Sequence, residues 1–412
     1  MLSKPVNLSF KYIGAICAGL LLLLIILLPH NTIWDEDWYM YCVGYLKYYG
    51  FTRNFVHTDP AAPMHAIIYY LLGPITHDKP VAIRLVNYVM CLSTCFFVYK
   101  TILLIKPEMK INFTYTLTLF AVPCFFVIGF FAISEAPCLL LYSISVYLFL
   151  KSVSAKKNIM LVLLAGIFLG LAIMTRQLFL LCIMPPVLLL FFGLNKQHII
   201  MVALYIIASL LICAPIFYIW KGLTPPGSVF HHSLLSLLAP KNLFLSFGYA
   251  FLYFMCLIPK YLYGFLTGRK IQIMVLTLLG IATSFIIKDA SFLPMSGLLP
   301  RIFPEQAIVV IAKVYFVIVC ILSFYLFYFF IYEFFTNLKN FTQVFLLASI
   351  ALILFSAIAV HDQFSSRYPL QSAPLMLIFC YNRMRPVGLK VQVLICAVVI
   401  ITNLISVVTF FN

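Results

Sequence analysis

The sequence predicts an all-α polytopic membrane protein with about thirteen transmembrane helices. Of its 412 residues, 64% are hydrophobic and only 9% are charged, and the mean hydropathy is +1.10. A soluble domain is about one quarter charged, so this composition excludes an ordinary soluble fold. Apolar runs long enough to cross roughly 30 Å of hydrocarbon recur along the chain, and helices satisfy their own backbone hydrogen bonds in that layer. We expect a single transmembrane domain over residues 1–412.

The first apolar run follows Lys4 and Lys11, and we interpret it as an uncleaved signal anchor. It is longer than the apolar core of a signal peptide, and no small-residue cleavage site follows it. The expected spans, in chain order, are 11–29, 81–105, 114–132, 138–150, 158–174, 178–193, 198–219, 243–259, 270–287, 307–332, 342–360, 368–381 and 391–411.

The distribution of basic residues predicts the orientation of these spans. The formal net charge is +16, with 27 Lys and Arg residues against 11 Asp and Glu residues. With a cytoplasmic N-terminus, most basic residues fall in short cytoplasmic loops together with only two acids, Glu108 and Glu333, as the positive-inside rule predicts. These basic residues are Lys4, Lys11, Lys100, Lys106, Lys110, Lys151, Lys156, Lys157, Lys196, Lys260, Arg269, Lys270, Lys339, Arg383, Arg385 and Lys390. No basic face with interleaved aromatic residues is left over, so we expect membrane lipids and no nucleic acid as partners.

The first outer loop, residues 30–80, carries the strongest functional signal. It opens with Asp35, Glu36 and Asp37 between two tryptophans, and many tyrosines follow. Aromatic residues at this density are typical of helices that lie in the membrane interface. The acids can accept a proton in catalysis, or they can stabilise the N-terminus of such an interfacial helix.

Two short outer turns add further charged candidates. Glu135 lies in Ser-Glu-Ala-Pro, and it is either a helix N-terminal acid or a second carboxylate in the same cavity. Arg176, followed by Gln177, either reaches lipid headgroups or uses its fork of donors to bind a phosphate.

Other outer residues complete the candidate set. Lys313 lies inside an otherwise apolar helix, where an ionisable group usually faces a cavity or a partner. Arg84 and Arg367 are further cations, which can bind phosphate, pair with a local acid or anchor against headgroups. His231 and His232 can contact a polar acceptor, but no carboxylate or Cys at ligand spacing supports a metal site.

Acids and cations on one side of a membrane bundle indicate group transfer from a lipid phosphate. A carboxylate would deprotonate an acceptor hydroxyl, while Arg and Lys would neutralise the departing phosphate. A transporter or lipid flippase is the competing class, but the sequence shows no convincing internal repeat. An acyl- or phosphotransferase is a third possibility, for which the adjacent pair His361-Asp362 is a candidate.

The chain resembles the GT-C superfamily of integral-membrane glycosyltransferases, which includes protein O-mannosyltransferases, the lipid A aminoarabinose transferase and dolichol-pathway transferases. The resemblance covers most of the chain and depends on several short motifs. These are Asp35-Glu36, Asp59-Pro60 with Pro63, Ala82-Ile83-Arg84-Leu85-Val86-Asn87, the turns around Glu135 and Arg176-Gln177, and Arg367-Tyr368-Pro369.

The resemblance implies inverting transfer of a hexose or pentose from a polyprenyl- or dolichyl-phosphate donor to a glycan, lipid or protein hydroxyl. It implies Asp35 as the base, with Glu36 or Asp37 orienting it or the acceptor. It implies Arg176, Lys313, Arg84 and Arg367 as donor-phosphate residues. The substrate contacts would be Asp59, Glu135, Gln177, His231 and His232.

The location and the cofactor follow less directly from these patterns. We favour a bacterial inner membrane over the endoplasmic reticulum, with the active site on the periplasmic or lumenal face, because the sequence shows no added lumenal domain. No ligand spacing demands a metal, although a divalent cation among Asp35, Asp37 and Glu135 is left open.

Overall fold

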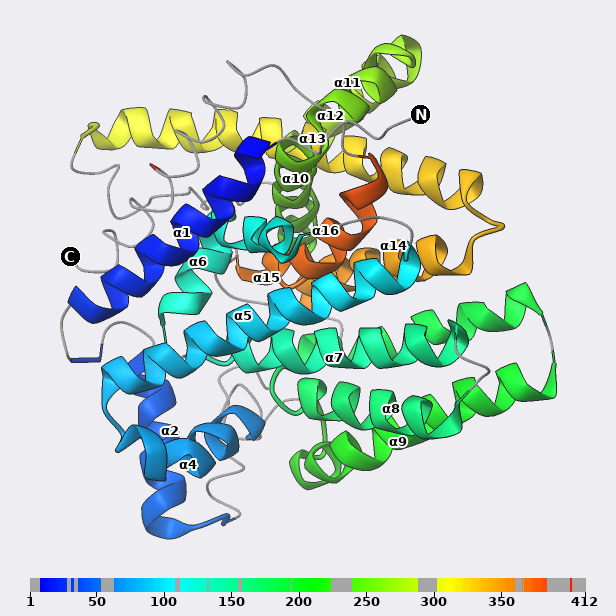
Figure 1. Cartoon of the computed structure of the whole chain (residues 1–412). Helices are drawn as coiled ribbons and strands as arrows, with labels where there is room; N and C mark the ends of the chain where they lie inside the picture. The colour runs from blue at the N-terminus through cyan, green and yellow to red at the C-terminus, as the bar shows by residue number, and fades with distance from the viewer. Residues whose placement is uncertain are drawn as a thin grey trace. The chain divides into compact units, whose positions relative to one another are not determined.

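The computed structural model consists of helices joined by turns, and its described residues contain no strand (Figure 1). The described residues are 8–27, 31–32, 36–52, 63–107, 112–131, 133–154, 158–193, 195–223, 239–287, 302–359, 365, 367–383 and 401. This helical content agrees with the predicted all-α class.

Backbone contacts divide the chain into two compact units. Residues 11–121 and 125–232 form one, which we call the N-terminal unit. Residues 1–10, 122–124 and 233–412 form the other, which we call the C-terminal unit. A single transmembrane domain over residues 1–412 stays a prediction.

The N-terminal unit is a bundle of long helices with two shorter helices at one end. In chain order its elements, with η marking 3-10 helices, are α1 (Leu8–Leu27), α2 (Glu36–Tyr49), α4 (Met64–Thr76), α5 (Pro80–Ile105), η1 (Phe113–Ala121), α6 (Pro123–Phe130), α7 (Glu135–Ser154), α8 (Ile159–Ile173), η2 (Gln177–Ile183), η3 (Pro185–Phe192) and α9 (Lys196–Trp220). Helices α5, α7, α8 and α9 pack side by side in that order (Figure 1).

Two glycines bring the backbones of α8 and α9 into near contact. A Cβ added at Gly166 would lie 2.6 Å from the carbonyl oxygen of Tyr205, and one at Gly170 would lie 2.6 Å from Cβ of Ile212. Small residues four positions apart allow this close approach between membrane helices. Because higher residue numbers on α8 face higher numbers on α9, the two helices run parallel.

Gly170→Ala is therefore expected to lower the free energy of unfolding by about 1–3 kcal/mol, since the added methyl group has no space. Gly19→Ala is the matched control, because no atom lies within 4 Å of the Cβ that it adds on α1. The control should be neutral or slightly stabilising, as Ala favours helix over Gly. Thermal unfolding of both variants in detergent measures the difference, and equal unfolding temperatures would contradict the close packing.

The short helices α2 and α4 pack against the ends of the long helices through an apolar cluster. Cys42 and Val43 of α2 and Ala66 of α4 are buried there with Ile83 of α5 and Trp220 of α9. The opposite face of α2 leaves large aromatic side chains exposed, as expected for an interfacial helix. These are Trp38, Tyr41, Tyr48 and Tyr49.

An ion pair on the surface joins α2 to the turn between α4 and α5. Lys47 Nζ lies 2.6 Å from Asp78 Oδ2. The hydrogen bond to this carboxylate raises the pKa of Lys47 above its usual value. The pair is exposed to solvent, so it adds little to stability.

The C-terminal unit is organised around one long helix, α13 (Glu305–Thr336). Its other elements are α10 (Pro240–Leu257), α11 (Pro259–Thr267), α12 (Lys270–Ile286), α14 (Phe341–Ser356), η5 (Ala357–Ala359), α15 (Arg367–Leu370), α16 (Ala373–Cys380) and η6 (Tyr381–Arg383).

Aromatic pairs connect α10 to α13 along their length. The ring centroids of Tyr249 and Tyr315 lie 6.1 Å apart, and those of Phe254 and Phe329 lie 5.7 Å apart. Edge-to-face pairs of this kind add to the stabilisation from buried area. Because Phe254 of α10 meets Phe329 of α13, the end of α10 lies beside the last turns of α13.

Helix α12 runs antiparallel to α13. The hydroxyl of Thr277 lies 2.7 Å from that of Tyr325, and a Cβ at Gly280 would lie 2.6 Å from Cα of Ile321. Consequently α10 and α13 end, and α12 begins, at the same end of the unit. We call it the basic end, because many of the predicted cytoplasmic cations lie there.

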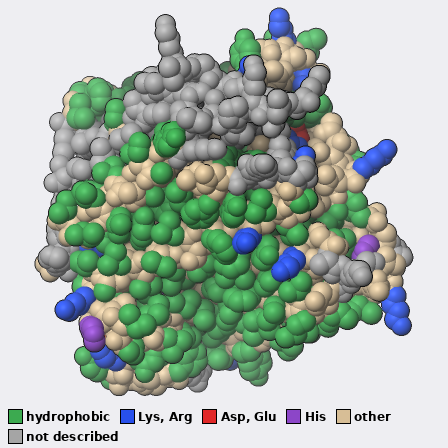
Figure 2. Space-filling model, viewed as in Figure 1, with side chains coloured by type: hydrophobic (Ala, Val, Ile, Leu, Met, Phe, Trp, Pro, Cys, Tyr) green, Lys and Arg blue, Asp and Glu red, His purple; other side chains and the backbone are tan. Residues whose placement is uncertain are grey.

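The described helices make the chain an integral membrane protein, as predicted. Five helices are long and apolar enough to cross a membrane, or six if α10 and α11, which meet at 112°, form one broken span. Hydrophobic side chains cover most of the described surface on the face in Figure 2. Shorter apolar helices are also present, and the count of about thirteen spans stays a prediction.

Two expected spans have a different internal structure from continuous α-helices. In place of the span expected at 114–132 the structure has η1 and α6, with a break before Pro123. In place of the span expected at 178–193 it has η2 and η3, with a break before Pro185-Pro186. Proline has no backbone N–H to donate, so the α-helical hydrogen bonds are interrupted at these positions.

Candidate active site

Helix ends of the N-terminal unit meet around the acidic run. Helix α2 begins at Glu36, α5 begins at Pro80 and α7 begins at Glu135. Helix α8 ends shortly before Arg176, which precedes η2. Side-chain contacts between these ends bring several predicted residues together.

Glu36 and Arg84 form a buried bidentate ion pair. Arg84 donates from Nε to Glu36 Oε1 at 3.0 Å and from Nη2 to Oε2 at 2.6 Å. Nη2 also donates to the carbonyl oxygen of Asn31 at 2.8 Å, and the ring of Phe130 lies 5.0 Å from the guanidinium carbon. The side chains of Glu36 and Arg84 are 1% and 0% exposed. The pair therefore fixes the start of α2 against the start of α5.

The other two acids of the run have different surroundings. Asp37 is exposed on the first turn of α2, and its carboxylate accepts a hydrogen bond from the hydroxyl of Thr32. Asp35 lies outside the described residues, directly before the anchored Glu36. Its role as the base stays a prediction.

Glu135 and Arg176 form a second acid–arginine pair. Glu135 is fully buried and accepts a hydrogen bond from Nη2 of Arg176, whose side chain is 14% exposed. Among the described residues, the buried Nε of Arg176 has no hydrogen-bond partner. The guanidinium thus retains a donor for a further acceptor, such as a phosphate oxygen.

Tyr39 and Ser134 lie between the two pairs. Tyr39 is one turn after Glu36 on α2, and its hydroxyl lies 3.3 Å from Ser134 Oγ. Ser134 Oγ is also 3.4 Å from Oε2 of Glu135. The ring of Tyr39 packs edge-on against that of buried His65, with centroids 4.9 Å apart. These contacts link α2, α4 and the start of α7. We call these linking residues, together with the two ion pairs, the acid–arginine cluster.

Further buried hydrogen bonds lie near the cluster. The hydroxyl of Tyr69 donates to Asn87, and Asn87 in turn donates to the carbonyl oxygen of Phe131. The N–H of Met64, at the start of α4, donates to the carbonyl oxygen of Met174 at 3.0 Å. Buried polar groups that are paired in this way hold their helices in one arrangement.

The described residues do not include every predicted site residue. Asp59, His231 and His232 lie outside the described residues. Gln177 is the first residue of η2, half-buried next to Arg176.

Lys313 and Arg367 belong to the C-terminal unit. Lys313 is exposed on α13, and Arg367 is half-buried, with its Nε donating to Ser365 Oγ at 3.0 Å. Their assignment to the donor phosphate stays a prediction.

Within the described part of the chain, no group of three His, Cys, Asp or Glu side chains is arranged to hold a metal ion. Of the acids that the sequence left open for a divalent cation, Glu135 is engaged by Arg176, Asp37 is bonded by Thr32 and Asp35 is outside the described residues.

Sequence reasoning missed the residues that link the two ion pairs. Tyr39 was counted only as an interfacial aromatic residue, and His65 was not singled out. Ser134 was noted only as the neighbour of Glu135. Helical spacing could have identified Tyr39, because it follows Glu36 by three residues and therefore lies on the same face of the helix.

Comparisons with known proteins agree with the predicted family resemblance. Residues 59–220 match the family model described as dolichyl-phosphate-mannose-protein mannosyltransferase. No curated protein matches the chain.

Three solved structures are similar to the chain. ArnT from Cupriavidus metallidurans bound to undecaprenyl phosphate has a TM-score of 0.50 at 12% identity, over 95% of this chain and 62% of that chain. The apo state of the same ArnT gives 0.41 at 12%, over 97% and 76%. The S. cerevisiae Pmt1-Pmt2 complex bound to the sugar donor gives 0.39 at 15%, over 58% and 36%. The chain thus spans less than two thirds of the length of the Pmt and undecaprenyl-phosphate-bound ArnT chains.

The apolar helices and the buried acid–arginine cluster define a polytopic membrane protein with a polar site at one end of a helical bundle. The predicted resemblance to the GT-C superfamily of integral-membrane glycosyltransferases is confirmed by the family match and by the fold shared with ArnT.

Proposed function

We propose that the chain is an inverting glycosyltransferase that moves a sugar from a polyprenyl-phosphate donor to a hydroxyl group. The observation that carries this proposal is the acid–arginine cluster. Its two pairs, Glu36 with Arg84 and Glu135 with Arg176, lie at the ends of α2, α5, α7 and α8, and Asp35 directly precedes Glu36 in the sequence. The family match supports a mannosyltransferase-like reaction, and the fold is shared with a structure that is bound to undecaprenyl phosphate.

The two pairs have different roles in the proposed reaction. Both oxygens of Glu36 accept hydrogen bonds from Arg84, so this carboxylate positions α2 and leaves Asp35 as the base. Because Arg84 is fully buried against Glu36, we propose that it orients the acidic run and does not bind phosphate. Arg176 is partly exposed and retains a donor, so it is our first choice for the donor phosphate. Lys313 and Arg367 remain further candidates.

The proposed step is a single displacement at the anomeric carbon. Asp35 takes the proton of the acceptor hydroxyl, and the hydroxyl oxygen forms a bond to that carbon. The bond from the carbon to the phosphate oxygen breaks on the opposite face, so the configuration inverts. The polyprenyl phosphate leaves with the bonding electrons, and the Arg176 guanidinium stabilises its negative charge. We place this reaction at the periplasmic or lumenal face, on a cell-envelope, lipid-linked or protein acceptor.

Arg176→Lys tests the phosphate assignment. Lysine keeps the charge beside Glu135 but loses the planar fork, so kcat/KM for the donor should fall by about tenfold to a hundredfold. The assay follows a labelled sugar from undecaprenyl- or dolichyl-phosphate donors to hydroxyl acceptors, with purified protein in lipid vesicles. Lys196→Gln, at an exposed cation at the start of α9, is the matched control and should not change the rate.

Two results would contradict the proposal. Unchanged donor kinetics in Arg176→Lys would remove Arg176 from the donor site. Movement of labelled lipid across the vesicle membrane without sugar transfer to any acceptor would favour the flippase class instead.

A further inference from the structure

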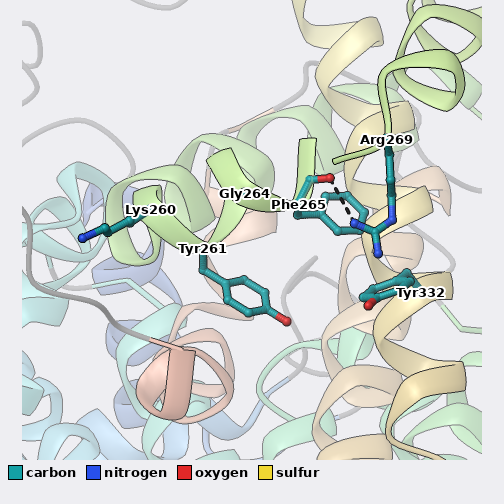
Figure 3. Close-up of a pocket in the computed structure, with 6 residues that line it drawn as sticks. All are labelled: Lys260, Tyr261, Gly264, Phe265, Arg269 and Tyr332. Carbon is teal, nitrogen blue, oxygen red and sulfur yellow. Dashed lines mark hydrogen bonds between the residues drawn. The ribbon is translucent and has the colours of Figure 1, made fainter. Parts of the chain in front are cut away.

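We propose that the C-terminal unit binds the phosphate of an anionic phospholipid in a pocket at its basic end. The pocket has a volume of about 460 Å³ and lies between α11, the start of α12 and the last turns of α13 (Figure 3). Its lining residues are Lys260, Tyr261, Gly264, Phe265, Arg269 and Tyr332.

Helix α11 has the geometry of an interfacial helix. It leaves the axis of α10 at 112°, with Pro259 as its first residue. Leu262 and Phe265 are buried beneath it, whereas Lys260 and Tyr263 are exposed. A helix that buries apolar side chains on one face and exposes Lys and Tyr on the other is typical of a helix that lies along the membrane surface. The pocket beneath it is therefore at the depth of lipid headgroups.

Arg269 supplies the main cation of the pocket. Its guanidinium carbon lies 4.6 Å from the ring centroid of Phe265 and 4.1 Å from that of Tyr332. Nη1 donates to the carbonyl oxygen of Phe265 at 3.1 Å. The two rings and this bond hold the planar group in place while its remaining donors stay available for a phosphate. Lys260, at the other end of α11, adds a second positive charge (Figure 3).

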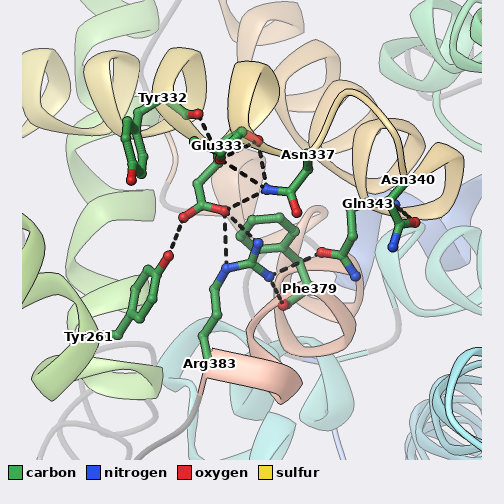
Figure 4. A network of polar contacts seen from close by, with 9 residues as sticks. Tyr261, Tyr332, Glu333, Asn337, Asn340, Gln343, Phe379 and Arg383 are labelled. Atoms are coloured by element: carbon green, nitrogen blue, oxygen red, sulfur yellow. Dashed lines mark hydrogen bonds and ion pairs between the residues drawn. The ribbon is translucent and has the colours of Figure 1, made fainter.

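The nearby acid does not cancel this charge. Glu333 follows Tyr332 on α13 but is 1% exposed, and Arg383 donates to it from Nε at 3.1 Å and also from Nη2 (Figure 4). Tyr261 donates to its Oε1 at 2.6 Å, and Asn337 Nδ2 donates to Oε2 at 3.0 Å. Because Arg383 balances Glu333, Lys260 and Arg269 leave the pocket with net positive charge.

This network also gives the pocket a rigid wall. Arg383 Nη1 donates to Gln343 Oε1 and to the carbonyl oxygen of Phe379, each at 3.0 Å. The network thereby connects α11, α13, α14 and α16, and it fixes the hydroxyl of Tyr261 at the edge of the pocket (Figure 4). A preformed site of this kind binds with little loss of side-chain entropy.

The composition of the pocket favours a lipid phosphate over free phosphate. Basic pockets between helix ends at a membrane surface bind anionic headgroups, and three aromatic rings line this one. Within α13 the pocket is also far from Lys313, a candidate for the donor phosphate. Tyr332 follows Lys313 by nineteen residues on one helix, which places them about 28 Å apart along α13.

Binding of a short-chain phosphatidylglycerol to the purified full-length protein tests the proposal. The dissociation constant is obtained from thermal stabilisation as the lipid concentration rises, with phosphatidylcholine and inorganic phosphate as comparison ligands. Arg269→Gln should weaken phosphatidylglycerol binding at least about tenfold, because a charge-assisted contact is lost. Lys339→Gln, at an exposed cation of the same end that does not line the pocket, should bind like the wild type.

Gly264→Met is a second variant that changes no charge. No atom lies within 4 Å of a Cβ added at Gly264, so the longer side chain fills open pocket space and leaves the fold intact. We expect the same loss of at least about tenfold in phosphatidylglycerol affinity.

Four results would overturn the proposal. Unchanged binding in Arg269→Gln or in Gly264→Met would place the lipid elsewhere. An equal loss in Lys339→Gln would indicate only general attraction to basic residues. Competition by inorganic phosphate at the same concentration as the lipid would identify a free-phosphate site. None of these measurements depends on sugar transfer, so they stand apart from the proposed activity.

Discussion

Asp35→Asn is expected to lower the rate of sugar transfer by about 10²–10⁴-fold, the usual contribution of a general base. Asparagine has nearly the same shape but cannot accept the proton of the acceptor hydroxyl. The measurement is transfer of labelled sugar at saturating donor concentration. The unfolding temperature should not change, because the Glu36 and Arg84 pair that anchors α2 remains intact.

Asp37→Asn is the matched control for this prediction. Asp37 is exposed and accepts a hydrogen bond from Thr32, so its neutral variant should change the rate far less. Full activity after both Asp35 and Asp37 are neutralised would refute a carboxylate base in this position.

Arg84→Met is expected to lower the free energy of unfolding by about 3–5 kcal/mol. The substitution removes the guanidinium group, so the cost of burying the charged carboxylate of Glu36 is no longer offset. Adding Glu36→Gln to the variant should recover part of the loss, because the uncompensated charge is removed as well. Denaturant titration in detergent, followed by the fluorescence of buried Trp220, measures this coupling.

Lys47→Met provides the comparison with an exposed ion pair. The side chains of Lys47 and Asp78 are 52% and 32% exposed, so water screens their attraction and little change in the free energy of unfolding is expected.

Strictly additive effects of Arg84→Met and Glu36→Gln on the free energy of unfolding would show that the two buried side chains do not act as a pair.

The sequence predicted features that depend on composition and on local spacing. Apolar runs located most of the long helices, since a bilayer requires a continuous apolar stretch. The start of α2 at Glu36 follows from acids next to an aromatic-rich segment, and the structure confirms a helix that begins there. The resemblance to the GT-C superfamily could also be predicted, because its motifs are short segments of the sequence.

Which distant residues form ion pairs with each other could not be predicted in the same way. Arg84 and Glu36 are 48 residues apart, and nothing local distinguishes a cation that binds phosphate from one that neutralises a buried acid. Glu333 did carry a signal, since a carboxylate within an apolar helix implies a partner. Its partner Arg383 lies 50 residues away and was counted only as a cytoplasmic charge.

The parallel contact of α8 with α9 has a consequence for the segment between them. Two neighbouring helices that point the same way require their connection to travel back over the full thickness of the layer. Gln177–Phe192 comprises a seven-residue and an eight-residue 3-10 helix joined by Met184. At roughly 2.0 Å per residue these sixteen residues extend about 32 Å, whereas an α-helix of that length extends about 24 Å. The larger rise per residue of the 3-10 helix therefore allows this segment, which is too short to span the membrane as an α-helix, to reach from one membrane face to the other.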